Sequence, residues 1–403
     1  MVYDLILRSG RVIDPSQTLD ATMDVAFLDG KVAAIGSRLE SEAGTVEQDV
    51  SGLIVTPGLL DLHTHVYWGG TSLGIDAEAF GRASGVTTVV DTGSAGPGNF
   101  AGFRQHIIEK SQVRILALLN VSFAGIYGFG SQVGENEEIK LLSAVRSVEV
   151  IEANRDVIAG VKVRVGKYAS GNSGLAPLDM ALEVADETCL PLMAHIDFPP
   201  PSYEEVVSRL RRGDILTHAF RPFPNAPINS RGVIRAAVRE ARERGVLFDI
   251  GHGQGSFAFK TARAMLTEGF QPDTISSDIH AGSIDGPVFD QTTTLSKFLC
   301  LGMSLNEVIT ASTLNAASAL RQPELGSLKP GSTGDATILT LEEGSFDYID
   351  CMNEVIRGGQ RLVARGVVLN GRWWNSWKDD REAAAKRAPI SSHSKKQSNY
   401  NDE

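Results

Sequence analysis

Cysteine is scarce in this sequence, which contains three cysteines among 403 residues. Cys189, Cys300 and Cys351 are scattered and form no CxxC pair. Their spacing therefore excludes a disulfide-rich scaffold and gives no cysteine-based metal motif. We expect reduced, mostly buried thiols, as is typical of a cytosolic protein.

An excess of positive charge and a long apolar run are also missing. The chain has 38 Lys and Arg residues against 49 Asp and Glu residues, and its net charge is -11. Such an acidic chain is unsuited to non-specific nucleic-acid binding or to docking on anionic lipid. No apolar run reaches the roughly 20 residues of a membrane helix, and residues 1–15 lack the pattern of a signal peptide. We expect a cytoplasmic protein with no nucleic-acid or membrane partner.

Strand patterns are distributed differently in the two parts of the chain. Residues 1–52 contain short strand patterns separated by Gly, Pro, Asp and Ser turn signals, as in "LDGKVAAIG". From residue 53, strand patterns alternate with helical patterns that begin at Ser, Asp or Pro and end at Gly. The expected strands span residues 52–63, 86–93, 113–121, 157–166, 190–195, 214–220, 245–252 and 273–278.

This alternation over residues 53–322 predicts an α/β fold, a (β/α)8 TIM-like barrel. The alternative is an open doubly wound sheet, but no GxGxxG or GxxxxGKS/T motif opens a helix here. Residues 323–375 return to strand and hairpin patterns. We expect them to pair with residues 1–52 in a small β-sandwich-like domain built from both chain ends. Residues 376–403 are polar and are expected to form a disordered tail.

Potential metal ligands stand at the carboxyl ends of several predicted strands. The stretch "TPGLLDLHTHV" places two histidines one residue apart, so both side chains point to the same face of a strand. A single histidine at a strand end is more often a core or surface residue. Active sites of barrels lie at this end of the strands, however, and several candidates converge there. The combination predicts a metal centre with the ligands His63, His65, Lys162, His195, His218 and Asp278.

Lys162 is an unusual member of this set, because a protonated amine has no lone pair. Carboxylation of the amine by CO2 would turn it into an anionic oxygen donor able to bridge two cations. Lys167 is the competing candidate in the same segment. We prefer Lys162 because it lies within the apolar run "VIAGVKVRVG", whereas Lys167 lies in the loop that follows.

The motifs "DLHTHV", "GVKVR", "PLMAHI", "DILTHAF" and "SSDIH" resemble those of the amidohydrolase superfamily. "FDIGHGQGSFAF" resembles its amidohydrolase/deacetylase branch, which is related to dihydroorotase. The resemblance covers roughly residues 3–372 and implies two divalent ions, usually zinc. It implies that His63, His65 and Asp278 hold the more buried ion, that His195 and His218 hold the exposed ion, and that carboxylated Lys162 bridges both.

The same set of ligands implies a hydrolytic mechanism. A hydroxide that bridges the two ions would attack a substrate carbonyl. Asp278 would take the proton as general base and deliver it to the leaving nitrogen or oxygen as general acid. Tyr168, Arg221, His252 and His280 are candidates for substrate contact, since each follows a predicted strand. For each of the four, loop solvation or support of a metal ligand is the alternative.

We therefore expect a metal-dependent hydrolase of an amide or ester in a small molecule, such as an N-acyl amino acid or an O-acetylated 2-hydroxy acid. The alternative is a cyclic amide hydrolase of the dihydroorotase or hydantoinase type. Thr and Ser follow "HTHVYWGG", however, where the Arg-rich carboxylate grip of those enzymes would stand. A non-enzymatic relative would be expected to lack ligands, and all six are present. Relatives often form dimers or larger assemblies, so a homo-oligomer is compatible with the sequence.

Overall fold

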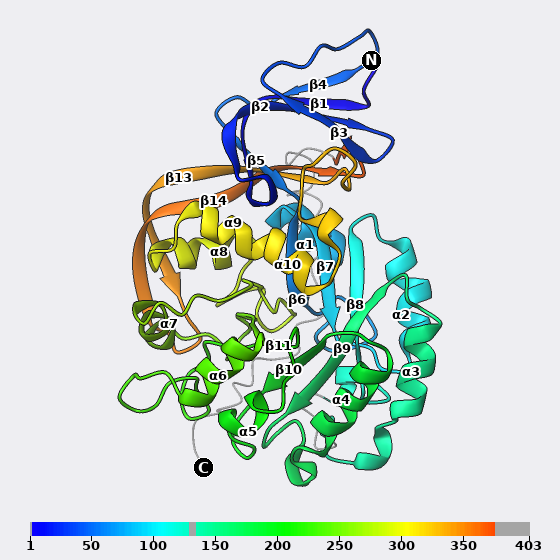
Figure 1. Ribbon diagram of the computed structural model, residues 1–403, viewed down its shortest axis with the longest axis vertical. Coiled ribbons are helices and arrows are strands. Elements are labelled where there is room, and N and C mark those ends of the chain that lie inside the picture. Colours follow the sequence, from blue (N-terminus) through cyan, green and yellow to red (C-terminus); the bar gives the residue numbers. More distant parts are fainter. Residues whose placement is uncertain (1, 129–133, 375–403) are drawn as a thin grey trace.

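The computed structural model describes residues 2–128 and 134–374, and the predicted polar tail at 376–403 lies outside the described residues. The chain forms a mixed α/β structure with two sheets (Figure 1). One sheet is entirely parallel and is flanked by helices. The other is largely antiparallel and gathers strands from both ends of the described chain.

The parallel sheet carries most of the predicted βα alternation. Its strands are buried runs rich in Val, Ile and Leu, and β9 is buried at every position, as is typical of a parallel sheet covered on both faces. In the order of pairing, the strands are β12 (Leu247–Phe248), β11 (Ile215–Leu216), β10 (Leu192–Ile196), β9 (Ile158–Val165), β8 (Arg114–Asn120), β7 (Val86–Thr92) and β6 (Leu59–Thr64).

The strand predicted at residues 273–278 is wrong as a regular strand. The segment makes only isolated parallel bridges, from Thr274 to Asp249 beyond β12 and from Ile279 to Thr64 in β6. The buried Asp61 carboxylate holds it in place by accepting hydrogen bonds from the Ser277 backbone N–H at 2.9 Å and from the Ser277 hydroxyl. The segment thus contacts both edges of the parallel sheet through backbone hydrogen bonds, from the Ile250 N–H to the Thr274 carbonyl on one side and from the His65 N–H to the Ile279 carbonyl on the other, although it is not a regular strand.

The helices begin and end where capping residues allow. Asp76 caps the start of α1 and Gly85 ends it with a left-handed φ of 73°, and both α5 and α9 begin with a Ser–Glu capping box. Figure 1 shows α2, α3 and α4 along one side of the parallel sheet. The helices are α1 (Ala77–Ser84), α2 (Phe100–His106), α3 (Ala144–Glu152), α4 (Ala176–Glu187), α5 (Tyr203–Val207), α6 (Ala236–Arg244), α7 (Phe259–Thr267), α8 (Gln291–Cys300), α9 (Leu305–Ser312) and α10 (Leu314–Ala319).

The second sheet joins the two ends of the described chain. Its central contact is the antiparallel pairing of β5 with β13, while β5 also lies parallel to β1. Along the sheet the order is β15 (Arg372–Trp373), β14 (Val355–Leu369), β13 (Ala336–Ile349), β5 (Ile54–Pro57), β1 (Leu5–Asp14), β2 (Leu19–Leu28) and β3 (Lys31–Gly36), and β4 (Val46–Asp49) pairs with β1.

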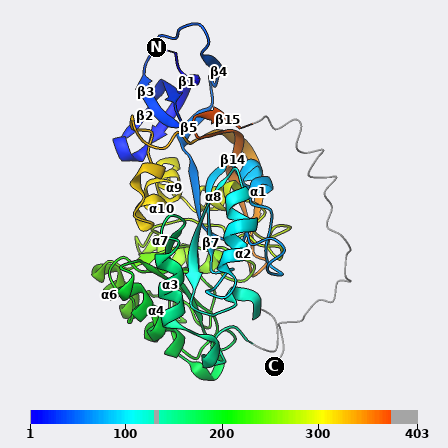
Figure 2. The same ribbon diagram turned by 90° about the vertical axis from the view of Figure 1, so that its right-hand side faces the viewer.

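The hairpin of β13 and β14 extends beyond this sheet. It runs down the helical part of the molecule beside α8 (Figures 1 and 2). The Leu362 backbone N–H donates to the Ser296 hydroxyl of α8 at 2.9 Å, and Tyr348, Leu362 and Ala364 belong to the main hydrophobic core. The hairpin therefore ties the two sheets together through one continuous core.

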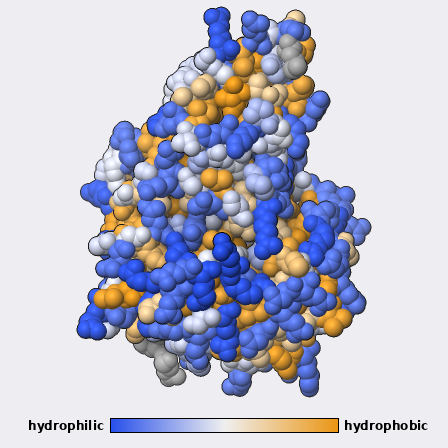
Figure 3. Space-filling view, viewed as in Figure 1, coloured by the Kyte–Doolittle hydropathy of each residue, from blue (hydrophilic) through white to orange (hydrophobic). Residues whose placement is uncertain are grey.

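Hydrophilic residues dominate the face drawn in Figure 3, and hydrophobic residues form small separate areas on it. Within residues 2–128 and 134–374, none of the helices has both the length and the apolar character needed to cross a bilayer.

Candidate metal centre

His63 and His65 stand at the carboxyl end of β6, and both rings point toward the same carboxylate. The Nε2 atoms of His63 and His65 lie 3.4 and 3.3 Å from the Asp278 Oδ1 atom. All three residues are buried. Residues i and i+2 of a strand point to the same face, so His63 and His65 place two imidazole nitrogens beside a single carboxylate oxygen.

A hydrogen-bond relay fixes the tautomer of His63. The Thr217 hydroxyl donates to the buried Asp249 carboxylate at 2.8 Å, so its oxygen accepts from His63 Nδ1–H, also at 2.8 Å. Thr274 and Ser276 donate to the same carboxylate. Because the proton of His63 is held on Nδ1, its Nε2 atom presents a lone pair to the centre.

His65 is held by a second relay of the same kind. Its Nδ1 atom lies 3.0 Å from the Ser94 hydroxyl, which is hydrogen-bonded to the buried Asp91 carboxylate. Ser94 belongs to the stretch 93–100, in which both Ser94 and Ala95 are buried. The stretch packs beneath the centre and leads into α2.

His195 and His218 form a second pair beside the first. His195 lies in β10, and His218 lies just after β11 with a left-handed φ of 62°. The His218 Nδ1–H donates to the Gly251 carbonyl at 2.7 Å, so its Nε2 atom carries a lone pair. This Nε2 atom lies 2.6 Å from the Nδ1 atom of His195. The rings of His63 and His218 lie 5.1 Å apart, which joins the two pairs.

Lys162 lies between these groups, on β9. Its side chain is fully buried, and its Nζ atom lies 3.5 Å from His63 Nε2 and 3.3 Å from Met193 Sδ. Neither neighbour is an anion, and burial lowers the pKa of Lys162 to about 7. The competing candidate Lys167 is exposed and lies over the Tyr168 ring. The structure thus brings Lys162, and not Lys167, into the cluster.

Asp278 occupies a strained and crowded position. Its backbone has a left-handed φ of 48°, and its N–H donates to the His63 carbonyl at 2.7 Å. Burial raises the pKa of its carboxyl group to about 6. Gly253 packs so closely that a Cβ atom added there would lie 2.2 Å from Asp278 Oδ2. The carboxylate is therefore confined between this glycine and the two histidines of β6.

This donor set fits a divalent cation. Ligand atoms of His63, His218 and Asp278 all lie within 4.8 Å of one another. Burial lowers the pKa of His65 to about 3 and that of His63, His195 and His218 well below the usual range, so the imidazoles are neutral. Neutral imidazoles with a carboxylate are the ligands that zinc and similar ions take.

The predicted substrate contacts Tyr168 and Arg221 have different surroundings. Tyr168 is about half exposed, and its ring lies 5.6 Å from that of Phe198 at the rim. Arg221 is buried, and its Nη1 donates to the Ile196 carbonyl. That guanidinium is therefore directed into the protein wall rather than into open solvent.

His252 and His280 are both buried near the ends of the last strands. His252 bonds to the Gly253 carbonyl at 2.9 Å and to the Nζ atom of the buried Lys297 at 2.8 Å. His280 accepts a hydrogen bond from the Gly282 N–H at its Nδ1 atom, and its ring lies 6.2 Å from that of His65. His280 thus neighbours the cluster, whereas His252 faces Lys297.

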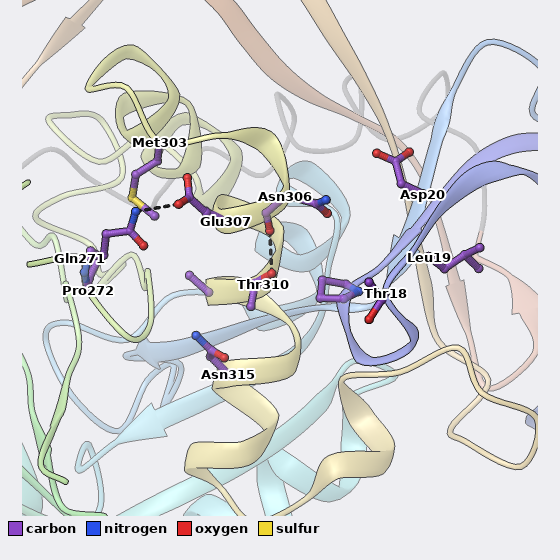
Figure 4. Close-up of a pocket in the computed structure, with 12 residues that line it drawn as sticks. Thr18, Leu19, Asp20, Gln271, Pro272, Met303, Asn306, Glu307, Thr310 and Asn315 are labelled. Carbon is purple, nitrogen blue, oxygen red and sulfur yellow. Dashed lines mark hydrogen bonds between the residues drawn. The ribbon is translucent and has the colours of Figure 1, made fainter. Parts of the chain in front are cut away.

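A cavity of about 330 Å³ lies elsewhere, between the start of β2 and α9 (Figure 4). Its polar groups bond mainly to one another: Gln271 donates to Glu307 at 2.7 Å and Thr310 donates to the Asn306 carbonyl. None of the predicted ligands lines this cavity. The chemistry of the chain is therefore concentrated at the histidine cluster.

Comparisons with known proteins show the family to which the chain belongs. Residues 258–373 match the model of the Amidohydrolase family. A deacetylase of Agrobacterium fabrum is 38% identical to this chain over 342 residues, which cover 85% of this chain and 84% of the relative. The chain belongs to the amidohydrolase superfamily. The resemblance in the sequence motifs is thereby confirmed.

Other members of the superfamily extend the comparison. A deacetylase of Enterococcus faecalis is 30% identical over 85% of this chain and 91% of its own length. A crystal structure of a dihydroorotase is 33% identical, has a TM-score of 0.85, and is matched over 92% of this chain and 97% of that one. A crystal structure of an adenine deaminase has a TM-score of 0.86 at 27% identity, over 93% of this chain and 100% of that one.

Proposed function

We propose that this chain is a binuclear metal-dependent hydrolase that removes an acyl group from the amide or ester of a small molecule. The observation that carries the proposal is the convergence of three buried imidazoles, the partly buried imidazole of His195, a buried lysine and a carboxylate. Burying so many polar groups together costs stability unless they are paired or bind a metal. Such a cluster is therefore a better candidate for chemistry than for structure.

The proposed centre divides its ligands between two ions, with zinc as the expected metal. His63, His65 and Asp278 would hold one ion, and His195 and His218 the other. Lys162 would serve both after carboxylation by CO2, which suits a buried amine whose neighbours are an imidazole and a thioether. When bound, the two ions supply Lewis-acid activation of water and of the substrate carbonyl at neutral pH.

The chain's own residues would then orient groups and move one proton. Asp278 lies between His63 and His65, where its carboxylate can take a proton from the attacking water. It would return that proton to the leaving nitrogen or oxygen, which departs readily only when protonated. The Asp249–Thr217 and Asp91–Ser94 relays would keep the two histidines in the required tautomer.

The contacts of the segment around Thr274–Ile279 support a proposal for the fold around the site. We infer that the segment around Thr274–Ile279 closes the parallel sheet into a (β/α)8-type barrel, because it bridges both edge strands. Residues 53–322 would form the barrel, and 1–52 with 323–375 a small β-domain. The Leu362–Ser296 contact supports a firm attachment between them.

We propose deacylation of an open-chain compound as the first candidate reaction. Relatives named deacetylase cover about 85% of this chain, whereas a dihydroorotase of Citrifermentans bemidjiense matches 34% of it at 38% identity. A cyclic amide hydrolase remains the second candidate, because the dihydroorotase crystal structure is 33% identical over 92% of the chain. N-acyl amino acids and O-acetylated 2-hydroxy acids are the substrates that we propose first.

Among the predicted substrate contacts, Tyr168 and His280 are the ones we retain. The exposed Tyr168 ring and its neighbour Phe198 offer an apolar rim for the substrate. His280 lies beside His65 and is placed to support or contact the bound molecule. We assign Arg221 and His252 to the wall of the site, since their polar atoms bond to Ile196 and Lys297.

The decisive experiment combines metal analysis with one substitution. The purified protein supplied with zinc and bicarbonate should hold about two divalent ions per chain and hydrolyse members of an acyl-compound panel. Asp278→Asn should keep most of its metal while kcat falls by about 1,000-fold or more, because the proton route is lost. Asp285→Asn, at an exposed carboxylate nearby, should change neither quantity. Near-normal turnover in Asp278→Asn would rule out the proposed role.

A further inference from the structure

The turn at residues 251–253 packs against proposed metal ligands at both of its ends. The Gly251 carbonyl accepts the hydrogen bond from His218 Nδ1–H at 2.7 Å, and a Cβ atom added at Gly251 would lie 3.0 Å from the same nitrogen. At the other end of the turn, a Cβ atom added at Gly253 would lie 2.2 Å from Asp278 Oδ2. The backbone of one short turn therefore lies against a proposed ligand of each ion.

His252 provides the side chain that can hold this turn. Gly251 and Gly253 have left-handed φ angles of 46° and 52°, and glycine leaves the backbone free to adopt many other conformations. Two backbone bonds hold one side of the turn, from the N–H groups of His252 and Gly253 to the Ser276 and Ser277 carbonyls at 3.2 and 2.9 Å. The fully buried ring of His252 adds a third contact, at 2.9 Å from its Nδ1 atom to the Gly253 carbonyl.

Lys297 holds the His252 ring from the opposite side. This lysine lies on α8 and is fully buried, and its Nζ atom lies 2.8 Å from His252 Nε2 and 2.7 Å from the Pro287 carbonyl. Burial lowers the pKa of His252 well below its usual range, so the ring is neutral. The Gly253 carbonyl can only accept, so the ring proton lies on Nδ1 and Nε2 accepts from Lys297.

Packing alone does not explain a lysine at this position. Burying an amine costs free energy, and neither of the two acceptors of Lys297 carries a charge that would offset this cost. A leucine or methionine would fill similar space on α8 without it. What the amine adds is a directed hydrogen bond to a ring that holds a glycine-flanked turn.

We propose that Lys297 and His252 are positioning residues that set the spacing between His218 and Asp278, and so between ligands of the two ions. The hydrogen bond from Lys297 fixes the ring, and the ring fixes the turn. The turn then presents its first carbonyl to His218 and its last glycine to the Asp278 carboxylate. This inference rests on the proposed function and adds no ligand to the centre.

The test uses the full chain loaded with cobalt(II), which takes imidazole and carboxylate ligands and whose visible absorption bands change with the arrangement of those ligands. In Lys297→Met these bands should shift, and kcat on an acyl substrate should fall by about 10- to 100-fold, as for other groups that orient metal ligands. KM should stay within about 3-fold of the wild type, because no substrate contact is removed. Lys260→Met, which removes an exposed lysine of α7, should change none of these quantities.

Substitutions at His252 supply the conservative comparison. His252→Phe keeps a ring that can pack against Phe257, whose centroid lies 4.7 Å away, but removes both hydrogen bonds of the imidazole. It should show the same spectral shift and the same loss of kcat as Lys297→Met. His252→Gln keeps an acceptor for Lys297, so its kcat should exceed that of His252→Phe by about 5-fold, the equivalent of one hydrogen bond. This pair of variants carries the test if Lys297→Met does not fold.

A purely structural role would lower stability and leave the metal centre unchanged. Val238→Ala, at a buried position of α6, provides that pattern as a control, with a lower midpoint of urea unfolding but wild-type kcat and cobalt bands. The same pattern in Lys297→Met and His252→Phe would overturn the inference. A wild type that binds cobalt but hydrolyses no acyl compound would count against the proposed function instead, and the cobalt bands would still decide the role of Lys297.

Discussion

Gly253 and Asp278 are packed so closely that one methyl group tests the site without removing a ligand. A Cβ atom at Gly253 would lie 2.2 Å from the Asp278 Oδ2 atom, and real Cβ contacts below 3.0 Å are essentially never seen. In Gly253→Ala the carboxylate oxygen must therefore retreat by about 0.8 Å, the difference between those distances. Because the two oxygens belong to one carboxylate, this retreat also moves Asp278 Oδ1, which lies 3.4 and 3.3 Å from the Nε2 atoms of His63 and His65.

The expected effect on turnover is much larger than the effect on folding. A misplacement of about 1 Å at a reacting group can cost about 100-fold in rate, so kcat of Gly253→Ala should fall by about that factor. Gly253 has a left-handed φ of 52°, where an alanine costs about 1 kcal/mol. The free energy of unfolding should therefore decrease by about 1 kcal/mol.

Gly255→Ala is the matched control, since no heavy atom lies within 4 Å of a Cβ atom placed there. Steady-state kinetics on an acyl substrate, zinc content and urea unfolding are measured for both variants. Gly255→Ala should resemble the wild type in all three. If Gly253→Ala kept kcat within about 3-fold of the wild type, the position of the Asp278 carboxylate would not matter, and our reasoning would be refuted.

Three further predictions concern groups around the ligands. Lys162→Met should lower zinc content from about two ions per chain to one or fewer, and two retained ions would disprove a bridging lysine. Thr217→Val breaks the relay to His63 and should weaken zinc binding by about 10- to 100-fold in a chelator competition, and unchanged affinity would contradict the relay. Burial lowers the pKa of Lys297 from 10.5 to about 7. The unfolded chain therefore binds the extra proton between these pH values, and wild-type stability should rise with pH across that window. In Lys297→Met, the increase in the free energy of unfolding between pH 7 and pH 9.5, measured by urea unfolding, should be smaller than in the wild type. An unchanged increase would mean that other groups cause it.

The metal-ligand candidates could be predicted because each one carries a local signal. His63 and His65 share one strand, and His195 lies within a predicted strand. The periodic apolar runs predicted the strands, and parallel strands place their carboxyl ends at the same edge.

The residues that hydrogen-bond to the ligand candidates could not be predicted, because they come from distant parts of the chain and meet only in the folded structure. The bond between His63 and Thr217 joins residues 154 positions apart, and that between Asn120 and Glu135 depends on how a loop returns to the sheet. Buried Asp, Ser and Thr residues occur throughout such strands, so composition does not distinguish Asp249 from its neighbours. Only coordinates show which carboxylate each hydroxyl contacts.

The wrongly predicted strand at residues 273–278 has a functional explanation. The sequence "DTISSD" has the β-branched character of a strand, yet Asp278 has a left-handed φ that a regular ladder does not allow. Strain of this kind persists only where surrounding contacts hold it, and it is common at functional sites. Here the Asp61–Ser277 bonds and the Asp278 N–H bond to His63 supply those contacts. His218 is strained in the same way. The regular strand is therefore lost where the carboxylate must turn toward the histidines of β6.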